Sequence, residues 1–216
     1  MFLPFWLTGG NGGPLTQLYE VFGLSRQGFI REHRYWQLVT HSLLHGNFLH
    51  WMTNAWILYY FGGRIRHLFG EGQVARIAIS SLIFGGIFHL LFQGKTPLVG
   101  ASGIAIGLFV ALCTVSPESR MAPLPVSAKN LRNGFLIASL LLLMLRPELR
   151  IPGFHQFGQY LIDTGGSSLF QMGHACHLGG ALAGWLSVRK YLRRPITLAQ
   201  LQRERAKREE DEKRVA

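Results

Sequence analysis

A serine and a histidine in two separate apolar segments are the residues of this chain best suited to chemistry. Ser102 lies in the turn Gly100-Ala101-Ser102-Gly103, which opens one apolar segment, and His177 lies within another. A serine hydroxyl next to a histidine base is a nucleophile for acyl transfer. Polar groups at bilayer depth are energetically costly and therefore indicate function. The pair predicts proteolysis inside a membrane.

The apolar segments lack the residues that other intramembrane protease classes need. They contain no Asp or Glu, which excludes an aspartyl protease, and the chain has no His-Glu-x-x-His motif for a zinc protease of that type. His41, His45 and His50 raise the alternative of a metal site, but no Cys or carboxylate accompanies them and their spacing matches no zinc signature. We expect no metal and no cofactor.

The glycines on both sides of Ser102 favour an exposed hydroxyl at the start of a helix. Gly100 and Gly103 allow a tight turn and leave the serine uncrowded. The first amides of a helix have no partner within it and lie at the positive end of its dipole, where they stabilise an oxyanion. A simple helix cap in a glycine-rich turn is the competing interpretation of this motif.

Glycines spaced four residues apart lie close to both candidate residues. They are Gly103 with Gly107, and Gly180 with Gly184. Small residues at this spacing let membrane helices approach closely. If the two faces pack together, Ser102 and His177 come within hydrogen-bond reach, ~2.6–3.2 Å. Helix packing alone also explains such glycines, but two faces beside the two halves of a dyad favour catalysis.

A third element precedes these two. His50 and Asn54 are four residues apart and share one face of a predicted helix. Both side chains can donate hydrogen bonds into the interior of a helical bundle, as the lining of an oxyanion hole requires.

The composition is that of a membrane protein. Of 216 residues, 48% are hydrophobic and 15% charged, against about 25% charged in soluble domains. The nearly charge-free stretches are residues 48–61, 73–92, 98–115, 133–145 and 172–188. Some are shorter than the ~20 residues of a full crossing, which is tolerable inside a bundle. We expect an all-α, polytopic transmembrane helical bundle.

The net charge of +11 reports topology rather than nucleic-acid binding. Ten of the 22 Lys and Arg residues follow the last apolar stretch, and six others lie in two alternate loops, against one and two in the loops between them. Because Lys and Arg concentrate in cytoplasmic loops, the C-terminus is predicted to be cytoplasmic. Loops 62–76 and 116–132 are then also cytoplasmic, and loops 93–99 and 146–171 lie outside. The expected partner is the lipid bilayer, not nucleic acid.

We divide the chain into a membrane domain, residues 1–192, and a charged cytoplasmic tail, residues 193–216. The tail either binds anionic headgroups or is simply solvated. Residues 1–7 are apolar but too short to cross a bilayer. We expect a first span that is incomplete in this chain; five spans in all is the alternative.

Together these elements resemble the rhomboid family of intramembrane serine proteases. The matching segments are residues 36–41, 45–54, 62–63, 100–103 and 177–184. The resemblance implies a six-helix core, here with a truncated first helix, around a water-filled cavity that opens outward. It implies Ser102 as nucleophile, His177 as general base without a third acid, and His174 as a structural companion. The oxyanion hole would consist of the Ser102 amide, His50 and Asn54.

The resemblance also assigns roles outside the dyad and shows departures. The fifth span and loop 146–171 are similar to the mobile gate and cap of the family. Gln37 stands where many members have an arginine, and Ile106 replaces an aromatic residue that in some members stacks on the histidine. The expected incomplete first span is a third departure.

The predicted function is hydrolysis of a peptide bond in or near the transmembrane helix of a substrate protein. Turnover should be slow, because no carboxylate orients the histidine. The alternatives are a catalytically silent relative that binds membrane clients, and a transporter or channel. A transporter would distribute polar residues through the bilayer, whereas here they cluster toward the outer half. The bacterial inner membrane is the expected location.

Overall fold

The computed structural model describes residues 14–120 and 125–192. The predicted incomplete first span, within residues 1–13, and the predicted tail, residues 193–216, lie outside the described residues. Within them the structure is helical, and strand-like pairing is confined to two isolated bridges, Leu24 with Leu98 and Arg120 with Ser127. The all-α prediction is therefore confirmed for the described part of the chain.

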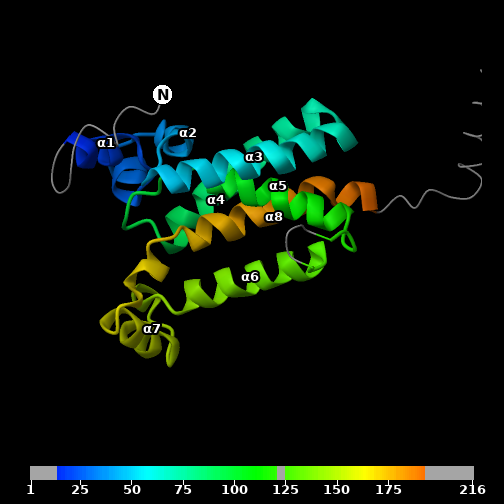
Figure 1. The fold of residues 1–216 in the computed structure, drawn as a ribbon. Helices are drawn as coiled ribbons and strands as arrows, with labels where there is room; N and C mark the ends of the chain where they lie inside the picture. Colours follow the sequence, from blue (N-terminus) through cyan, green and yellow to red (C-terminus); the bar gives the residue numbers. More distant parts are fainter. Residues whose placement is uncertain (1–13, 121–124, 193–216) are drawn as a thin grey trace, which may run out of the picture.

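Five long helices coincide with the five predicted apolar stretches. They are α3 (Phe48–Phe69), α4 (Glu71–Phe92), α5 (Ser102–Val115), α6 (Ala128–Met144) and α8 (His174–Leu192). Helices α3, α4, α5 and α8 lie side by side, and α6 runs along the outer side of this group (Figure 1).

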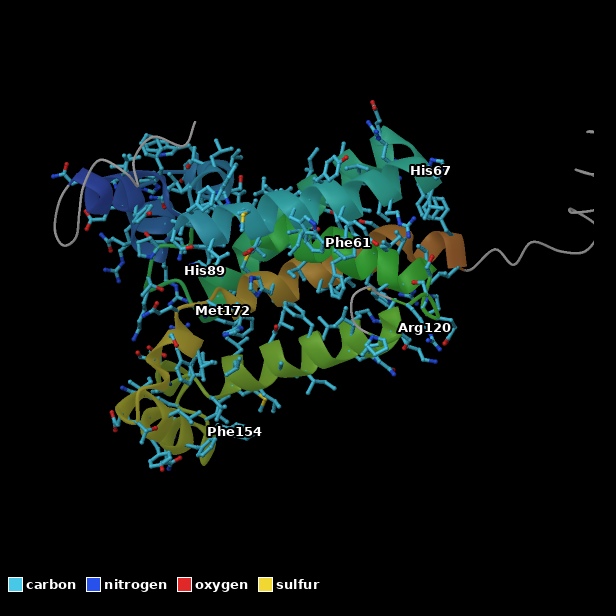
Figure 2. All side chains as sticks on the ribbon, in the orientation of Figure 1. Phe61, His67, His89, Arg120, Phe154 and Met172 are labelled. Carbon is cyan, nitrogen blue, oxygen red and sulfur yellow. The ribbon has the colours of Figure 1, made fainter. Side chains whose placement is uncertain are left out.

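Short helices gather at one end of the bundle. Before α3 come α1 (Pro14–Phe22), a π-helix (Gln27–Arg31), α2 (Gln37–Thr40) and a 3-10 turn (His41–Leu43). Between α6 and α8 come two 3-10 turns (Pro147–Leu149 and Gly166–Phe170) that flank α7 (Phe154–Asp163). His89 and Met172 mark this end, and His67 and Arg120 mark the opposite end (Figure 2). The sequence predicts that the first end faces outward.

Local sequence signals place the helix ends. The side chain of Asn47 accepts a hydrogen bond from the amide of His50 at 2.7 Å, which caps the start of α3. Gly70 has a φ of +80°, a conformation that suits glycine, and it turns the chain from α3 into α4. The hydroxyl of Ser127 accepts from the amide of Asn130 and begins α6.

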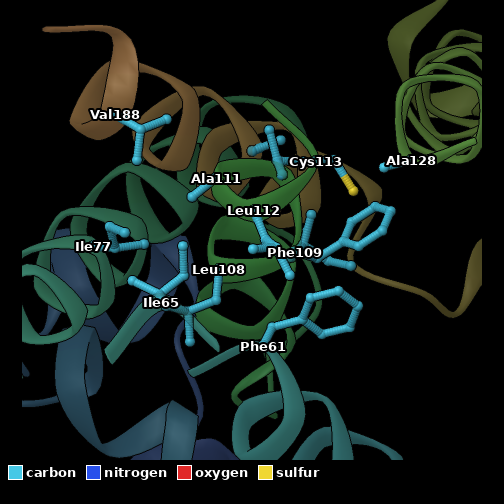
Figure 3. Close-up of a cluster of buried hydrophobic side chains, with 13 residues drawn as sticks. Phe61, Ile65, Ile77, Leu108, Phe109, Ala111, Leu112, Cys113, Ala128 and Val188 are labelled. Carbon is cyan, nitrogen blue, oxygen red and sulfur yellow. The ribbon is translucent and has the colours of Figure 1, made fainter. Parts of the chain in front are cut away.

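The main core lies between the four adjacent helices. It includes Ile65 of α3, Ile77 of α4, Leu108 of α5 and Val188 of α8, each at most 2% exposed (Figure 3). The rings of Phe61 and Phe109 meet edge to face with centroids 5.3 Å apart. Lipid tails are as apolar as these side chains, so close packing rather than exclusion of water holds such helices together.

The outer surface is strongly apolar. Tyr59 is 83% exposed, Leu91 61% and Ile137 59%, on three different helices. Broad exposed apolar surfaces mark contact with a membrane or partner. By length and composition, α4 is the one described helix able to cross a bilayer alone, and α5 has only 14 residues. At 1.5 Å per residue α5 reaches about 21 Å, so it depends on its neighbours.

Candidate active site

Ser102 and His177 meet where two helices begin. Ser102 is the first residue of α5, and His177 lies in the first turn of α8. Nε2 of His177 is 3.0 Å from Oγ of Ser102, a hydrogen-bond distance. The serine is half-buried and the histidine is 5% exposed.

The glycine faces of α5 and α8 lie directly against each other. A Cβ atom on Gly180 would collide with the carbonyl oxygen of Gly103, and one on Gly184 with that of Gly107. The hydroxyl of Ser81, on α4, donates to the carbonyl of Gly180 at 3.3 Å. Backbones therefore touch where α4, α5 and α8 meet, and this contact sets the separation of the two candidate catalytic residues.

The turn before Ser102 is held by backbone hydrogen bonds from a distant part of the chain. Gly100, with a φ of +114°, donates its amide to the carbonyl of His41 at 2.8 Å. Leu24 and Leu98 exchange two backbone bonds, of 3.0 and 2.8 Å. Only glycine adopts the backbone conformation at position 100 readily. The residues before α3 thus fix the position at which α5 begins.

His50 and Asn54 lie beside this turn. A Cβ atom on Gly100 would be 2.7 Å from Cε1 of His50 and 3.5 Å from Nδ2 of Asn54. Asn54 is 4% exposed, and its Nδ2 has no hydrogen-bond partner among the described residues. A buried amide without a partner is costly and calls for an explanation. This N–H group beside the serine turn is a candidate donor to a ligand.

His41 and His45 precede α3 and lie at the same end of the bundle as Ser102. The rings of His45 and His50 meet edge to face with centroids 5.2 Å apart. Burial, with a smaller contribution from His50, lowers the pKa of His45 to about 4. Burial also lowers the pKa of His41, which is 2% exposed. Both imidazoles are therefore neutral near pH 7.

Gln37, which the resemblance places where many family members have an arginine, is fully buried, and its side-chain oxygen and nitrogen are both hydrogen-bonded. Its amide nitrogen donates to the carbonyl of Glu20 at 2.9 Å, and its oxygen accepts from the amide of Ser25 at 3.3 Å. A guanidinium has no acceptor and could not make the second bond. The ring of His41 donates to the carbonyl of Gln37 at 2.8 Å, which links this residue to the serine turn.

Gln93 is a structural residue that the sequence analysis missed. Its side-chain oxygen accepts from the amide of Ala175 at 2.7 Å, and its nitrogen donates to the carbonyl of Met172 at 3.1 Å. These bonds pair two backbone groups at the start of α8, close to His177. A polar side chain at the end of the apolar run of α4 was the available signal.

The surroundings of His177 contain a second missed residue. The ring of Phe135, on α6, lies 5.8 Å from the His177 ring at 42°, and the His174 ring lies 6.2 Å away at 89°. Ile106 is itself buried in the core. His174 is 2% exposed and its Nε2 donates to the carbonyl of Leu169 at 2.8 Å. An aromatic neighbour of the histidine is thus present, but it comes from another helix.

No metal centre emerges from the described residues. They contain no group of three His, Cys, Asp or Glu side chains that could hold an ion. Cys113 and Cys176 are free and buried, on α5 and α8. Cys176 packs beside Gly85 and Gly103, in the same helix contact as the glycines.

Comparisons with known proteins identify the family to which this chain belongs. The Rhomboid domain family model matches residues 32–194. Rhomboid protease GluP of Bacillus subtilis is 30% identical over 119 residues, 55% of this chain and 23% of that protein. RHOMBOID-like protein 2 of Arabidopsis thaliana is 34% identical over 97 residues, 44% of this chain and 31% of the relative.

A third relative, Rhomboid protease GlpG of Photorhabdus laumondii, is 37% identical over 73 residues, 34% of this chain and 26% of that protein. The aligned parts thus span about a quarter to a third of these relatives. The family match covers most of the chain and includes every candidate site residue. The chain therefore belongs to the rhomboid family of integral membrane proteins.

Proposed function

We propose that this protein is a serine endopeptidase that cleaves transmembrane proteins within the bilayer. The observation that carries the proposal is the 3.0 Å contact between Nε2 of His177 and Oγ of Ser102. It lies at the start of a short helix in an apolar bundle, where the first amides are free to meet an oxyanion. Family membership and relatives named as proteases support the same activity.

In the proposed reaction the Ser102 hydroxyl transfers its proton to Nε2 of His177 while Oγ attacks the carbonyl carbon of the scissile bond. The tetrahedral oxyanion accepts hydrogen bonds from the Ser102 amide, His50 and Asn54. His177 then gives its proton to the leaving amine as the carbon–nitrogen bond breaks. Water, with His177 again as the base, hydrolyses the acyl-enzyme.

The same arrangement shapes our expectations for substrates and rate. A peptide bond inside a helix is shielded, so the substrate helix must unwind, and small or helix-breaking residues should lie near the cut. The imidazole has no carboxylate partner, so we expect kcat below ~10 s⁻¹, the median for enzymes. The distribution of Lys and Arg supports a cytoplasmic C-terminus. The compact architecture and the family resemblance are the grounds for proposing a bacterial inner membrane.

The test of the dyad is cleavage of a model transmembrane substrate in liposomes by wild type, Ser102→Ala and His177→Ala. We expect cleavage by wild type and none by either variant. Thermal unfolding in detergent serves as the control that all three proteins are folded. A folded but inert wild type would instead favour the second candidate, a silent client-binding protein.

A separate test addresses the oxyanion hole. Loss of one such donor costs about 100- to 1000-fold in kcat in other hydrolases. We expect Asn54→Ala to lose about 100-fold in kcat with little change in KM, because a buried amide nitrogen without a partner disappears. Thr53→Ala, one residue earlier on the exposed side, is the matched control and should cleave like wild type. Equal activity of Asn54→Ala and wild type would show that Asn54 does not contribute to the oxyanion hole.

A further inference from the structure

The catalytic imidazole proposed above lacks a polar partner on one side. Nε2 of His177 faces Ser102, but the buried Nδ1 has no hydrogen-bond partner among the described residues. In a serine triad a carboxylate at this nitrogen fixes the orientation and tautomer of the ring. Here other contacts must keep the ring plane directed at the serine.

Two rings lie near enough to do so, and they differ in origin. His174 belongs to α8, like His177, and is tied to the carbonyl of Leu169 at 2.8 Å. Phe135 belongs to α6, with its ring 5.8 Å from His177 at 42°. It also lies edge-on to Phe109 of α5, at 6.1 Å. Phe135 therefore joins the histidine to the helix that carries the serine.

Helix α6, which supplies this ring, has few residues buried within the protein. On α6, Ile137 is 59% exposed and Leu140 is 48% exposed, and a Cβ atom on Gly134 would meet nothing within 4 Å. Its buried residues are Ala128, Ser139 and Leu143. A long helix with three buried residues thus contributes a direct neighbour of the buried histidine.

We propose that Phe135 is a positioning residue that holds the His177 ring in its reactive orientation, so that the reactivity of Ser102 depends on where α6 lies. This inference rests on the proposed protease function. Aromatic pairs at this separation contribute modestly beyond their buried area. Loss of the ring should therefore slow the reaction about three- to tenfold rather than abolish it.

The test uses the full chain in liposomes and two readouts. One is the rate at which a small fluorophosphonate labels Ser102, which requires the dyad but no substrate helix. The other is kcat and KM for the model transmembrane substrate. The variants are Phe135→Leu, which removes the ring, and Phe135→Tyr, which keeps it. Ile137→Ala removes apolar bulk from the exposed side of α6 and is the matched control.

We expect Phe135→Leu to lower the labelling rate and kcat together, about three- to tenfold, with KM unchanged. Phe135→Tyr should restore at least half of the wild-type rate, and Ile137→Ala should match wild type. Faster or unchanged labelling of Phe135→Leu would overturn the proposal, because it would make Phe135 a barrier or simple packing. An equal loss in Phe135→Tyr would overturn it as well.

Two controls separate this inference from its premise. If Phe135→Leu does not fold, as judged by thermal unfolding, Phe135→Met replaces it, with similar volume and no ring. If wild-type Ser102 is not labelled at all, or is labelled equally in His177→Ala, the dyad itself fails. If labelling of wild type depends on His177 but not on Phe135, the dyad stands and the positioning role is wrong.

Discussion

The contact between α5 and α8 differs sharply from the contact that α6 makes with both. Between α5 and α8, glycines bring backbone against backbone, and an added methyl group at Gly180 or Gly184 would collide with a carbonyl oxygen. Along α6, Gly134 has open space around it, and large apolar side chains face outward. The α5–α8 contact holds Oγ of Ser102 and Nε2 of His177 at hydrogen-bond distance. The α6 contact places the ring of Phe135 beside His177, from a helix with few buried residues.

The two contacts therefore differ in what they determine. Backbone contacts cannot adapt by changing a rotamer, so they determine the distance between Ser102 and His177. Side-chain contacts along α6 can adapt to a substitution without changing the distance between the two residues. Substitutions in the two regions should therefore have effects of very different size.

The largest effect is expected for Gly180→Ala. The new methyl group must push α8 away from the Gly103 carbonyl, and overpacking of this kind costs about 1–3 kcal/mol in stability. A displacement of 1 Å between reacting groups can cost about 100-fold in rate. Cleavage in liposomes and thermal unfolding measure the two quantities. Wild-type activity in Gly180→Ala would show that the α5–α8 contact is more adaptable than its geometry indicates.

The next largest effect is expected for Gln93→Leu. The substitution leaves the Ala175 amide without its acceptor and removes one of two bonds to the Met172 carbonyl, which still accepts from the His174 amide at 2.9 Å. Each unsatisfied buried group costs about 1–3 kcal/mol, so the melting temperature should fall. Gln93→Glu retains the acceptor for Ala175 but places a buried carboxyl group against the Met172 carbonyl, so its melting temperature should also fall below that of wild type. A melting temperature equal to that of wild type in Gln93→Leu would mean that the start of α8 needs neither bond.

A smaller effect should appear in the pH dependence of stability. His45 has a folded-state pKa of about 4, below the ordinary value of 6.5, so it stays neutral in the fold while the unfolded chain binds a proton. Its contribution is complete above pH 6.5 and is lost as the pH falls from 6.5 to about 4. Unfolding of His45→Asn should therefore depend less steeply on pH in this window. Identical slopes for the two proteins would contradict the assignment.

The smallest effect is expected for Gly134→Ala on α6. Nothing lies within 4 Å of the added methyl group, and alanine favours a helix over glycine by about 1 kcal/mol. The protein should keep its cleavage activity and gain up to that amount in stability. A loss of activity comparable to that of Gly180→Ala would remove the distinction between the two regions.

The sequence predicts the parts of this structure that backbone and composition determine. Charge-free runs predict the five long helices, and the glycines predict the close approach of α5 and α8, because both signals are local. The ring contact of Phe135 depends on how α6 is rotated, and no local pattern reports that rotation. In the sequence Gln37 is a departure from an arginine. Its role as acceptor for the Ser25 amide could not be predicted, because it depends on Ser25 lying next to it in the fold. The partners of Gln93 are likewise distant in the chain.

The separation of Ser102 and His177 by 75 positions in the chain also matters during synthesis. Helices enter a membrane in chain order, so the serine is in place well before α8, which is the last described helix. On the proposed mechanism the growing chain has a nucleophile but no base until α8 inserts and its glycines reach α5. If the proposed activity is correct, the chain is inert beside its own unassembled segments and becomes active only when α8 has packed against α5.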